Sequence, residues 1–122
     1  MDSRAIPSAI YTDPEVASVG LRGGEVRPEE TVSCKVLFSS LGKAHVEGEP
    51  EGFLKMAASP KTGKIVNVSA LGAHVTELIG EAALAIRLGL TVKDLAETVH
   101  PHPTESEILQ KAAQELAKKI NF

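Results

Sequence analysis

The chain has 122 residues, of which 43% are hydrophobic, so it is long enough to bury a core of its own and we expect a single domain over residues 1–122. With 13 basic and 16 acidic residues its net charge is −3, which gives no positively charged surface for nucleic acid. The single cysteine, Cys34, excludes an internal disulfide, a redox cysteine pair and a thiolate zinc cage, and it suits a reducing cytoplasm. Because no apolar run has the length of a signal peptide or a membrane span, we expect no membrane partner.

The first half of the chain predicts β-strands. Near the N-terminus, two short extended pieces are expected on either side of a turn at Asp13-Pro14. Hydrophobic residues alternate over 32–38, which predicts a half-buried strand with Cys34 in the core. Two further runs, 52–58 and 64–71, flank the turn sequence SPKTG and predict a hairpin.

Two segments have no readable pattern. We assign no structure to residues 22–31 or to residues 39–52. The second segment, SSLGKAHVEGEPEG, is rich in glycine, and structureless connections of that length are uncommon in compact domains unless they are functional or mobile. It could cover a partner surface.

The second half of the chain predicts helices. Apolar residues recur at helical spacing over about 75–88. Thr91 and Asp94 match the two side chains of a capping box, which predicts a short helix from there to about residue 98. A last amphipathic helix is predicted over about 105–119. A block of strands followed by a block of helices predicts the α+β class, with an antiparallel sheet of about four strands and helices packed on one face.

The sequence VHPHPTESEILQ lies at the entrance of the last predicted helix. His100 and His102 each precede a proline, which pushes the preceding residue into an extended conformation, so both imidazoles are held on stiff backbone. Histidine titrates near about 6.5, and such a group can take a proton from a thiol and return it near neutral pH. Glu107 follows His102 by five residues and could fold back to orient its ring. His102 and Glu107 are therefore the candidate acid/base residues.

Glu107 has a second interpretation. Thr104 and Glu107 match a capping box, in which the threonine caps the helix and the glutamate returns to the threonine amide. Taken alone, the spacing favours this structural role over a catalytic one.

A metal site is a weaker possibility. His100 and His102, with His74 or His45, could supply nitrogen ligands. However, residues two apart on extended backbone point to opposite sides, so we expect no metal site. His45 is most simply a solvated residue, and His74 a surface or capping residue.

The motif HPHPTESE resembles the His-x-His-Pro-Thr-x-Ser-Glu signature in the C-terminal interface domain of the flavin-dependent pyridine-nucleotide disulfide oxidoreductases, and of the dihydrolipoamide dehydrogenases in particular. The resemblance extends over nearly the whole chain. AIPSAIYTDPEVASVGL is similar to the opening of that domain, residues 51–103 follow its hairpin and helices, and the terminal INF is similar to its ending. Glu105 and Ser69 depart from the common pattern, and neither has an assigned role.

The resemblance implies roles for several residues. His102 would be the catalytic histidine and Glu107 its partner, and His100 would be a supporting residue. The pair would project across a homodimer interface to the other subunit's redox disulfide and flavin, and would exchange a proton with a lipoyl-type dithiol. FAD and NAD would be the cofactors of the full-length enzyme. In this family context a pairing role for Glu107 gains weight, and a simultaneous helix cap remains compatible with it.

The chain itself lacks the parts that hold cofactors. It has no Gly-x-Gly-x-x-Gly fingerprint and no redox cysteine pair, so we expect the FAD-binding and NAD-binding domains to be absent and no cofactor to bind this chain alone. Whether the chain alone is an enzyme stays open. Residues 1–4 suggest an excised fragment, with a natural stand-alone chain as the alternative. The rival functions are a dimerisation or scaffold module without catalysis and a domain of a glutathione-reductase-like enzyme.

Overall fold

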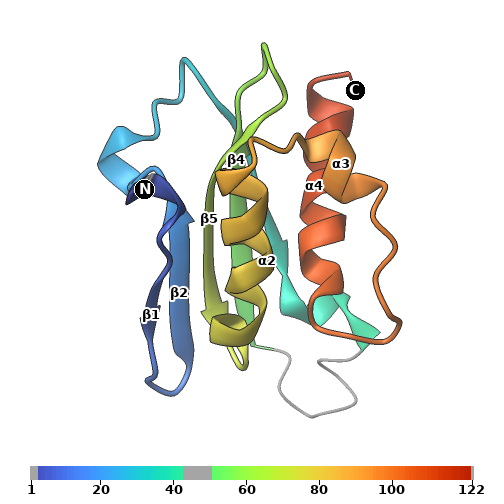
Figure 1. The fold of residues 1–122 in the computed structure, drawn as a ribbon. Helices are drawn as coiled ribbons and strands as arrows, with labels where there is room; N and C mark the ends of the chain where they lie inside the picture. Colours follow the sequence, from blue (N-terminus) through green and yellow to red (C-terminus); the bar gives the residue numbers. More distant parts are fainter. Residues whose placement is uncertain (1–2, 43–50, 122) are drawn as a thin grey trace.

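The computed structural model describes residues 3–42 and 51–121, which form a sheet covered by helices (Figure 1). The strands are β1 (Ser8–Ile10), β2 (Glu15–Gly20), β3 (Val32–Leu37), β4 (Gly52–Ala58) and β5 (Ile65–Gly72). The helices are α2 (Val75–Arg87), α3 (Val92–Ala96) and α4 (Glu107–Lys119), with short 3-10 turns η1 (Ser3–Ala5), η2 (Gly23–Glu25) and η3 (Phe38–Ser40).

The described strands form one five-stranded antiparallel sheet in the order β1-β2-β5-β4-β3. The predicted hairpin is β4–β5, and its turn is closed by a hydrogen bond from the Gly63 amide to the Ser59 carbonyl oxygen, with Gly63 at φ 75°. The two extended pieces on either side of Asp13-Pro14 are β1 and β2, and both belong to the sheet. The α+β class is confirmed, with a three-residue edge strand, β1, as the fifth strand.

The helices lie on one face of the sheet. Figure 1 shows α2 crossing in front of the sheet and α4 beside it, with α3 outside α4. α2 packs against β2 and β5, whereas α4 packs against β3 and β4. Alternate strand residues point toward these helices and are buried, as the period of an extended strand requires. The largest fully buried side chains are Phe38, Leu54, Met56, Ile108, Leu109, Leu116, Val68, Val75 and Val92.

Cys34 lies in this core, as the alternation over 32–38 predicts. Its side chain is buried, and its Sγ lies 3.4 Å from the Ala112 carbonyl oxygen of α4. Burial raises the pKa of the Cys34 thiol to about 11, because a thiolate loses its hydration there. The position therefore serves packing, since the reactive thiolate is disfavoured.

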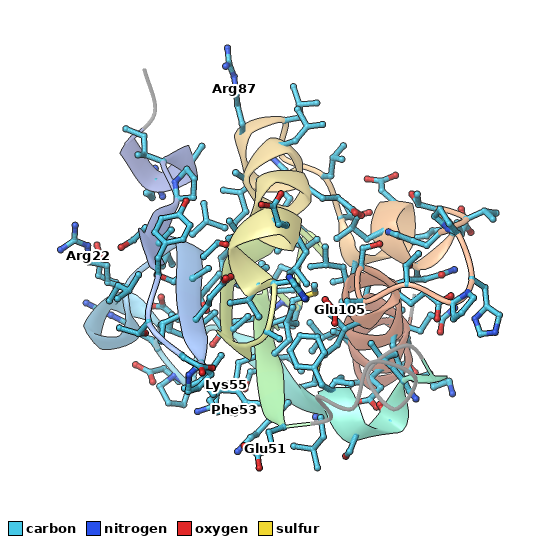
Figure 2. The ribbon with its side chains drawn as sticks, turned by 90° about the horizontal axis from the view of Figure 1, so that it is seen from below. Arg22, Glu51, Phe53, Lys55, Arg87 and Glu105 are labelled. Atoms are coloured by element: carbon cyan, nitrogen blue, oxygen red, sulfur yellow. The ribbon has the colours of Figure 1, made fainter. Side chains whose placement is uncertain are left out.

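None of the helices in the described part of the chain covers the other face of the sheet. Figure 2 shows Phe53 and Lys55 of β4 on the side turned away from α2. The strand register aligns an apolar row across this face, with Phe53 between Leu71 and Leu37. The Lys35 ammonium lies 4.5 Å from the centre of the Phe53 ring.

The helix ends differ in how well the sequence predicts them. The capping box of α3 is confirmed, because the Thr91 amide donates to Asp94 Oδ2 at 2.8 Å and the Asp94 amide donates to Thr91 Oγ1 at 3.3 Å. α3 ends at Ala96, earlier than the predicted residue 98, and α4 begins at Glu107, later than the predicted residue 105.

Where the structure describes them, the two segments without a predicted structure contain short turns, and Gly52, the last residue of the second segment, begins β4. η2 lies in the first, and the second begins in η3, followed by the buried Leu41. Residues 43–50 lie outside the described residues. Every helix within residues 3–42 and 51–121 falls short of the length and apolarity that crossing a membrane requires.

Candidate acid/base site

The candidate residues lie on the connection between α3 and α4. Figure 1 shows this segment descending from α3 and turning back into the lower end of α4. Its conformation follows from the sequence, because Pro101 and Pro103 cannot continue a helix and restrict the residues before them. The segment therefore reaches the N-terminal end of α4 as an extended chain that carries His100 and His102.

His102 and Glu107 are in direct contact. The His102 Nδ1 lies 2.7 Å from the Glu107 Oε1. The His102 side chain is 78% exposed, whereas that of Glu107 is 17% exposed. Because an ionised carboxylate only accepts hydrogen bonds, Nδ1 donates and the neutral ring keeps its lone pair on Nε2. The arrangement presents one basic nitrogen to the outside and holds the other on a half-buried carboxylate.

The predicted cap at Thr104 is wrong. The N-cap of α4 is Ser106, and no side-chain hydrogen bond caps the helix there. The Thr104 hydroxyl instead donates to the Pro101 carbonyl oxygen at 2.7 Å. Glu107 is therefore the first residue of the helix, where the helix dipole favours a carboxylate, and its side chain is left to contact His102.

A cavity of about 250 Å³ adjoins the pair. It lies between η3 and the first turns of α4, and the Lys111 ammonium closes one side by donating to the Ser40 carbonyl oxygen at 3.3 Å. The described lining residues are Ser40, Leu41, Gly42, His102, Glu107, Gln110, Lys111 and Gln114. The start of the 39–52 segment thus lies beside the candidate site, and its suggested role in covering a partner surface stays a prediction.

His100 is in the opposite situation. Its side chain is 5% exposed, with Nε2 2.7 Å from Glu81 Oε2 and Nδ1 3.0 Å from the Thr98 carbonyl oxygen. The Thr98 carbonyl oxygen only accepts, so Nδ1 donates to it; Nε2 donates to Glu81 when the ring is doubly protonated, and accepts from the carboxyl O–H when Glu81 carries the proton. The two imidazoles point to different surroundings, as expected for residues two apart, and only His102 faces outward.

Sequence reasoning missed Glu81. It lies in α2, 19 residues before His100, and no local spacing connects the two. The sequence signal for a contact at Glu81 is its position in an alanine-rich helix, because a partly buried carboxylate among apolar residues needs a polar partner.

The other described histidine, His74, does not line the cavity beside His102. His74 is exposed at the N-cap position of α2, with φ 64°. His45 lies outside the described residues. Among residues that the structure describes, no group of three or more His, Cys, Asp or Glu side chains could hold a metal ion.

Comparison with known proteins places the chain. The family model described as "Pyridine nucleotide-disulphide oxidoreductase, dimerisation domain" matches residues 6–113. The chain belongs to this dimerisation-domain family. The resemblance drawn from the HPHPTESE motif is thereby confirmed.

The relatives of this dimerisation domain include several dihydrolipoyl dehydrogenases. Dihydrolipoyl dehydrogenase 3 of Pseudomonas aeruginosa is 41% identical over 118 residues, which cover 95% of the chain and 25% of the relative. Dihydrolipoyl dehydrogenase of Bacillus subtilis is 42% identical over 115 residues, which cover 93% of the chain and 24% of the relative. The domain thus spans about a quarter of the length of the curated relatives it matches.

Solved structures support the fold of the dimerisation domain. LpdA from Mycobacterium tuberculosis superposes with a TM-score of 0.86 at 25% identity, over 95% of this chain and 26% of that one. The HOCl-induced flavoprotein disulfide reductase RclA from Escherichia coli gives a TM-score of 0.83 at 21% identity, over 89% of this chain and 26% of that one. At that identity, the second likeness concerns the fold alone.

Proposed function

We propose that this domain forms the homodimer of a dihydrolipoyl-dehydrogenase-like flavoenzyme and supplies His102 and Glu107 to the partner subunit's flavin–disulfide site. One observation carries the proposal: an exposed imidazole is held at Nδ1 by a half-buried carboxylate, with Nε2 left outward. The family and the dihydrolipoyl dehydrogenase relatives support the enzyme class.

In this proposal His102 moves a proton. Its Nε2 takes a proton from a thiol of the dithiol substrate, which leaves the more nucleophilic thiolate. The Glu107 carboxylate accepts from Nδ1–H throughout, keeps the ring in the tautomer with a free Nε2, and stabilises the imidazolium that forms. The proton returns from Nε2 when a thiol is regenerated.

The residues of this domain do not fit a dinucleotide site. The described sheet is antiparallel, the described strands form no parallel strand–helix–strand unit, and the sequence has no glycine-rich fingerprint. FAD and NAD would therefore be held by other parts of the full-length enzyme. When bound there, the flavin supplies the two-electron chemistry of dithiol oxidation. The domain's own part is proton exchange at His102.

The first test replaces His102 with glutamine in the full-length enzyme. Dithiol turnover should fall by about 10²- to 10⁴-fold, the usual contribution of a placed acid/base group, while flavin content stays the same. His74→Gln is the matched control, because His74 is an exposed histidine that does not line the cavity. Unchanged turnover in the H102Q enzyme would rule out the proposed role.

A second substitution tests the partner. Glu107→Gln keeps an acceptor oxygen near Nδ1 but removes the charge that stabilises the imidazolium, so turnover should fall by about tenfold. Glu97→Gln, at an exposed carboxylate of the same connection, should leave turnover unchanged. Equal rates for E107Q and E97Q would show that Glu107 does not assist His102.

The same enzymes separate the rival function. If the domain serves only as a dimerisation or scaffold module and takes no part in catalysis, the full-length H102Q and E107Q enzymes should both keep full turnover and an intact dimer. Sedimentation of the variants, run beside the turnover assay, distinguishes the two functions. Only the proposed function predicts that turnover falls while the dimer stays intact.

A further inference from the structure

Glu81 and His100 form a second carboxylate–imidazole pair, apart from His102 and Glu107. We infer that the Glu81–His100 pair positions His102, by fixing the backbone that carries the exposed ring. The catalytic meaning of this inference rests on the proposed function. The geometry behind it does not.

The His100 ring is held at both nitrogens. Nε2 lies 2.7 Å from Glu81 Oε2, Nδ1 lies 3.0 Å from the Thr98 carbonyl oxygen, and the side chain is 5% exposed. A ring that is enclosed and bonded on both sides has one orientation, because any rotation breaks a hydrogen bond that water cannot replace. His100 is thus a fixed point in the connection between α3 and α4.

The fixed point is coupled to His102 by the prolines. One residue, Pro101, separates the two histidines, and its ring fixes its own φ and restricts His100. Pro103 restricts His102 in the same way. Few torsions remain free between the two imidazoles, so the place of the His102 backbone follows from that of the His100 ring.

Two different helices therefore hold His102. Glu107 belongs to α4 and holds the ring directly. Glu81 belongs to α2, which packs against β2 and β5, and holds the backbone through His100. Two further hydrogen bonds lie in this connection: the Thr104 hydroxyl donates to the Pro101 carbonyl oxygen, and the Gln110 side-chain amide donates to the Ala96 carbonyl oxygen. Without Glu81, His102 would keep its contact with Glu107 on a less restrained segment.

The test uses Glu81→Ala in the full-length enzyme. A misplaced acid/base group should lower kcat by about 10- to 100-fold, with KM for the dithiol within about twofold, because the position of the proton-transfer group is lost and not substrate binding. Glu81→Gln should stay near the wild-type rate, since its amide can accept from Nε2–H through the oxygen or donate to a bare Nε2 through the nitrogen. Glu77→Ala, at an exposed glutamate one turn earlier on α2, is the matched control and should keep the wild-type rate.

The decisive comparison adds Glu81→Ala to the His102→Gln enzyme. If Glu81 acts through His102, the second substitution should change kcat by less than about twofold, because the effects of residues that act as a unit do not add. A full additional loss in that background, or an unchanged kcat for E81A alone, would overturn the inference and leave the proposed function standing. An H102Q enzyme with normal turnover would instead overturn the proposed function, and the positioning role with it. If E81A does not fold, Glu81→Leu replaces it, with the same outcomes.

Discussion

At the residue scale, identical side chains two positions apart have opposite surroundings. The side chain of His102 is exposed beside Glu107, whereas only 5% of the His100 side chain is exposed beside Glu81. The prolines that follow both histidines are the same, so the difference comes from which helix each ring meets. Chemistry at this site is thus decided by tertiary contact, on a backbone whose stiffness is local.

The Cys34 thiol gives a prediction at the same scale. In the folded state its pKa is raised to about 11 by burial, and in the unfolded chain it is about 8.5. The unfolded state therefore loses this proton first, and the stability linked to it should be complete below about pH 8.5 and decline toward pH 11, by about 1–2 kcal/mol at pH 10. Urea unfolding at pH 7.5 and at pH 10 measures this change in the free energy of unfolding. Cys34→Ala should remove this part of the pH dependence, and parallel curves for the two proteins would refute it.

At the element scale, the start of α2 is stabilised by a strand residue. His74 at the N-cap position makes no side-chain cap hydrogen bond. Glu15 of β2 takes that role, accepting from the Thr76 amide at 3.2 Å and from the Thr76 hydroxyl at 2.6 Å. The Thr76 hydroxyl, followed by its amide, lowers the pKa of the Glu15 carboxyl from its ordinary value.

Glu15→Gln should therefore destabilise the domain in a pH-dependent way. The amide still accepts hydrogen bonds but lacks the charge, so the loss at pH 7 should be at most about 1 kcal/mol once solvent screening is included. Because the folded pKa is depressed, the wild-type advantage is present above the unfolded pKa and disappears as the pH falls through the folded value. Thermal melts at pH 7 and pH 3 test this, with the exposed Glu29→Gln as control. An equal difference at both pH values would exclude the charge as the cause.

How far sequence predicts these elements depends on the range of the interaction. α2, α3 and the β4–β5 hairpin follow from local periodicity, capping and turn residues, and all three are present. The predicted start of α4 is two residues too early. The capping-box pattern assumes that the Thr104 hydroxyl caps the helix, whereas this hydroxyl donates to the Pro101 carbonyl oxygen. The His102–Glu107 contact joins residues five apart and was predictable, whereas the Glu81–His100 contact spans 19 residues and was not.

At the scale of the whole molecule, two of the described surfaces that carry exposed apolar side chains bear on dimerisation. One is the helix-free face of the sheet, where Leu37 is 51% exposed. The other is the outer side of α2, where Leu84 and Leu88 are 57% and 61% exposed. These two leucines are four residues apart and so lie side by side. Exposed apolar patches of this kind mark interaction surfaces.

We expect the α2 leucines to lie in the homodimer contact. Leu84 lies in the helix that also carries Glu81, Leu88 is the C-cap residue of that helix, and the proposed function requires the adjoining His102 segment to reach the partner subunit. Burying each leucine contributes about 1.5–3 kcal/mol, so Leu84→Lys with Leu88→Lys should weaken dimerisation by at least about 100-fold. Sedimentation equilibrium of the full-length enzyme measures this, and turnover should fall with the dimer fraction. Leu37→Lys, which charges the sheet face at similar exposure, should leave the dimer intact. Dissociation by L37K and not by the α2 variant would place the contact on the sheet instead.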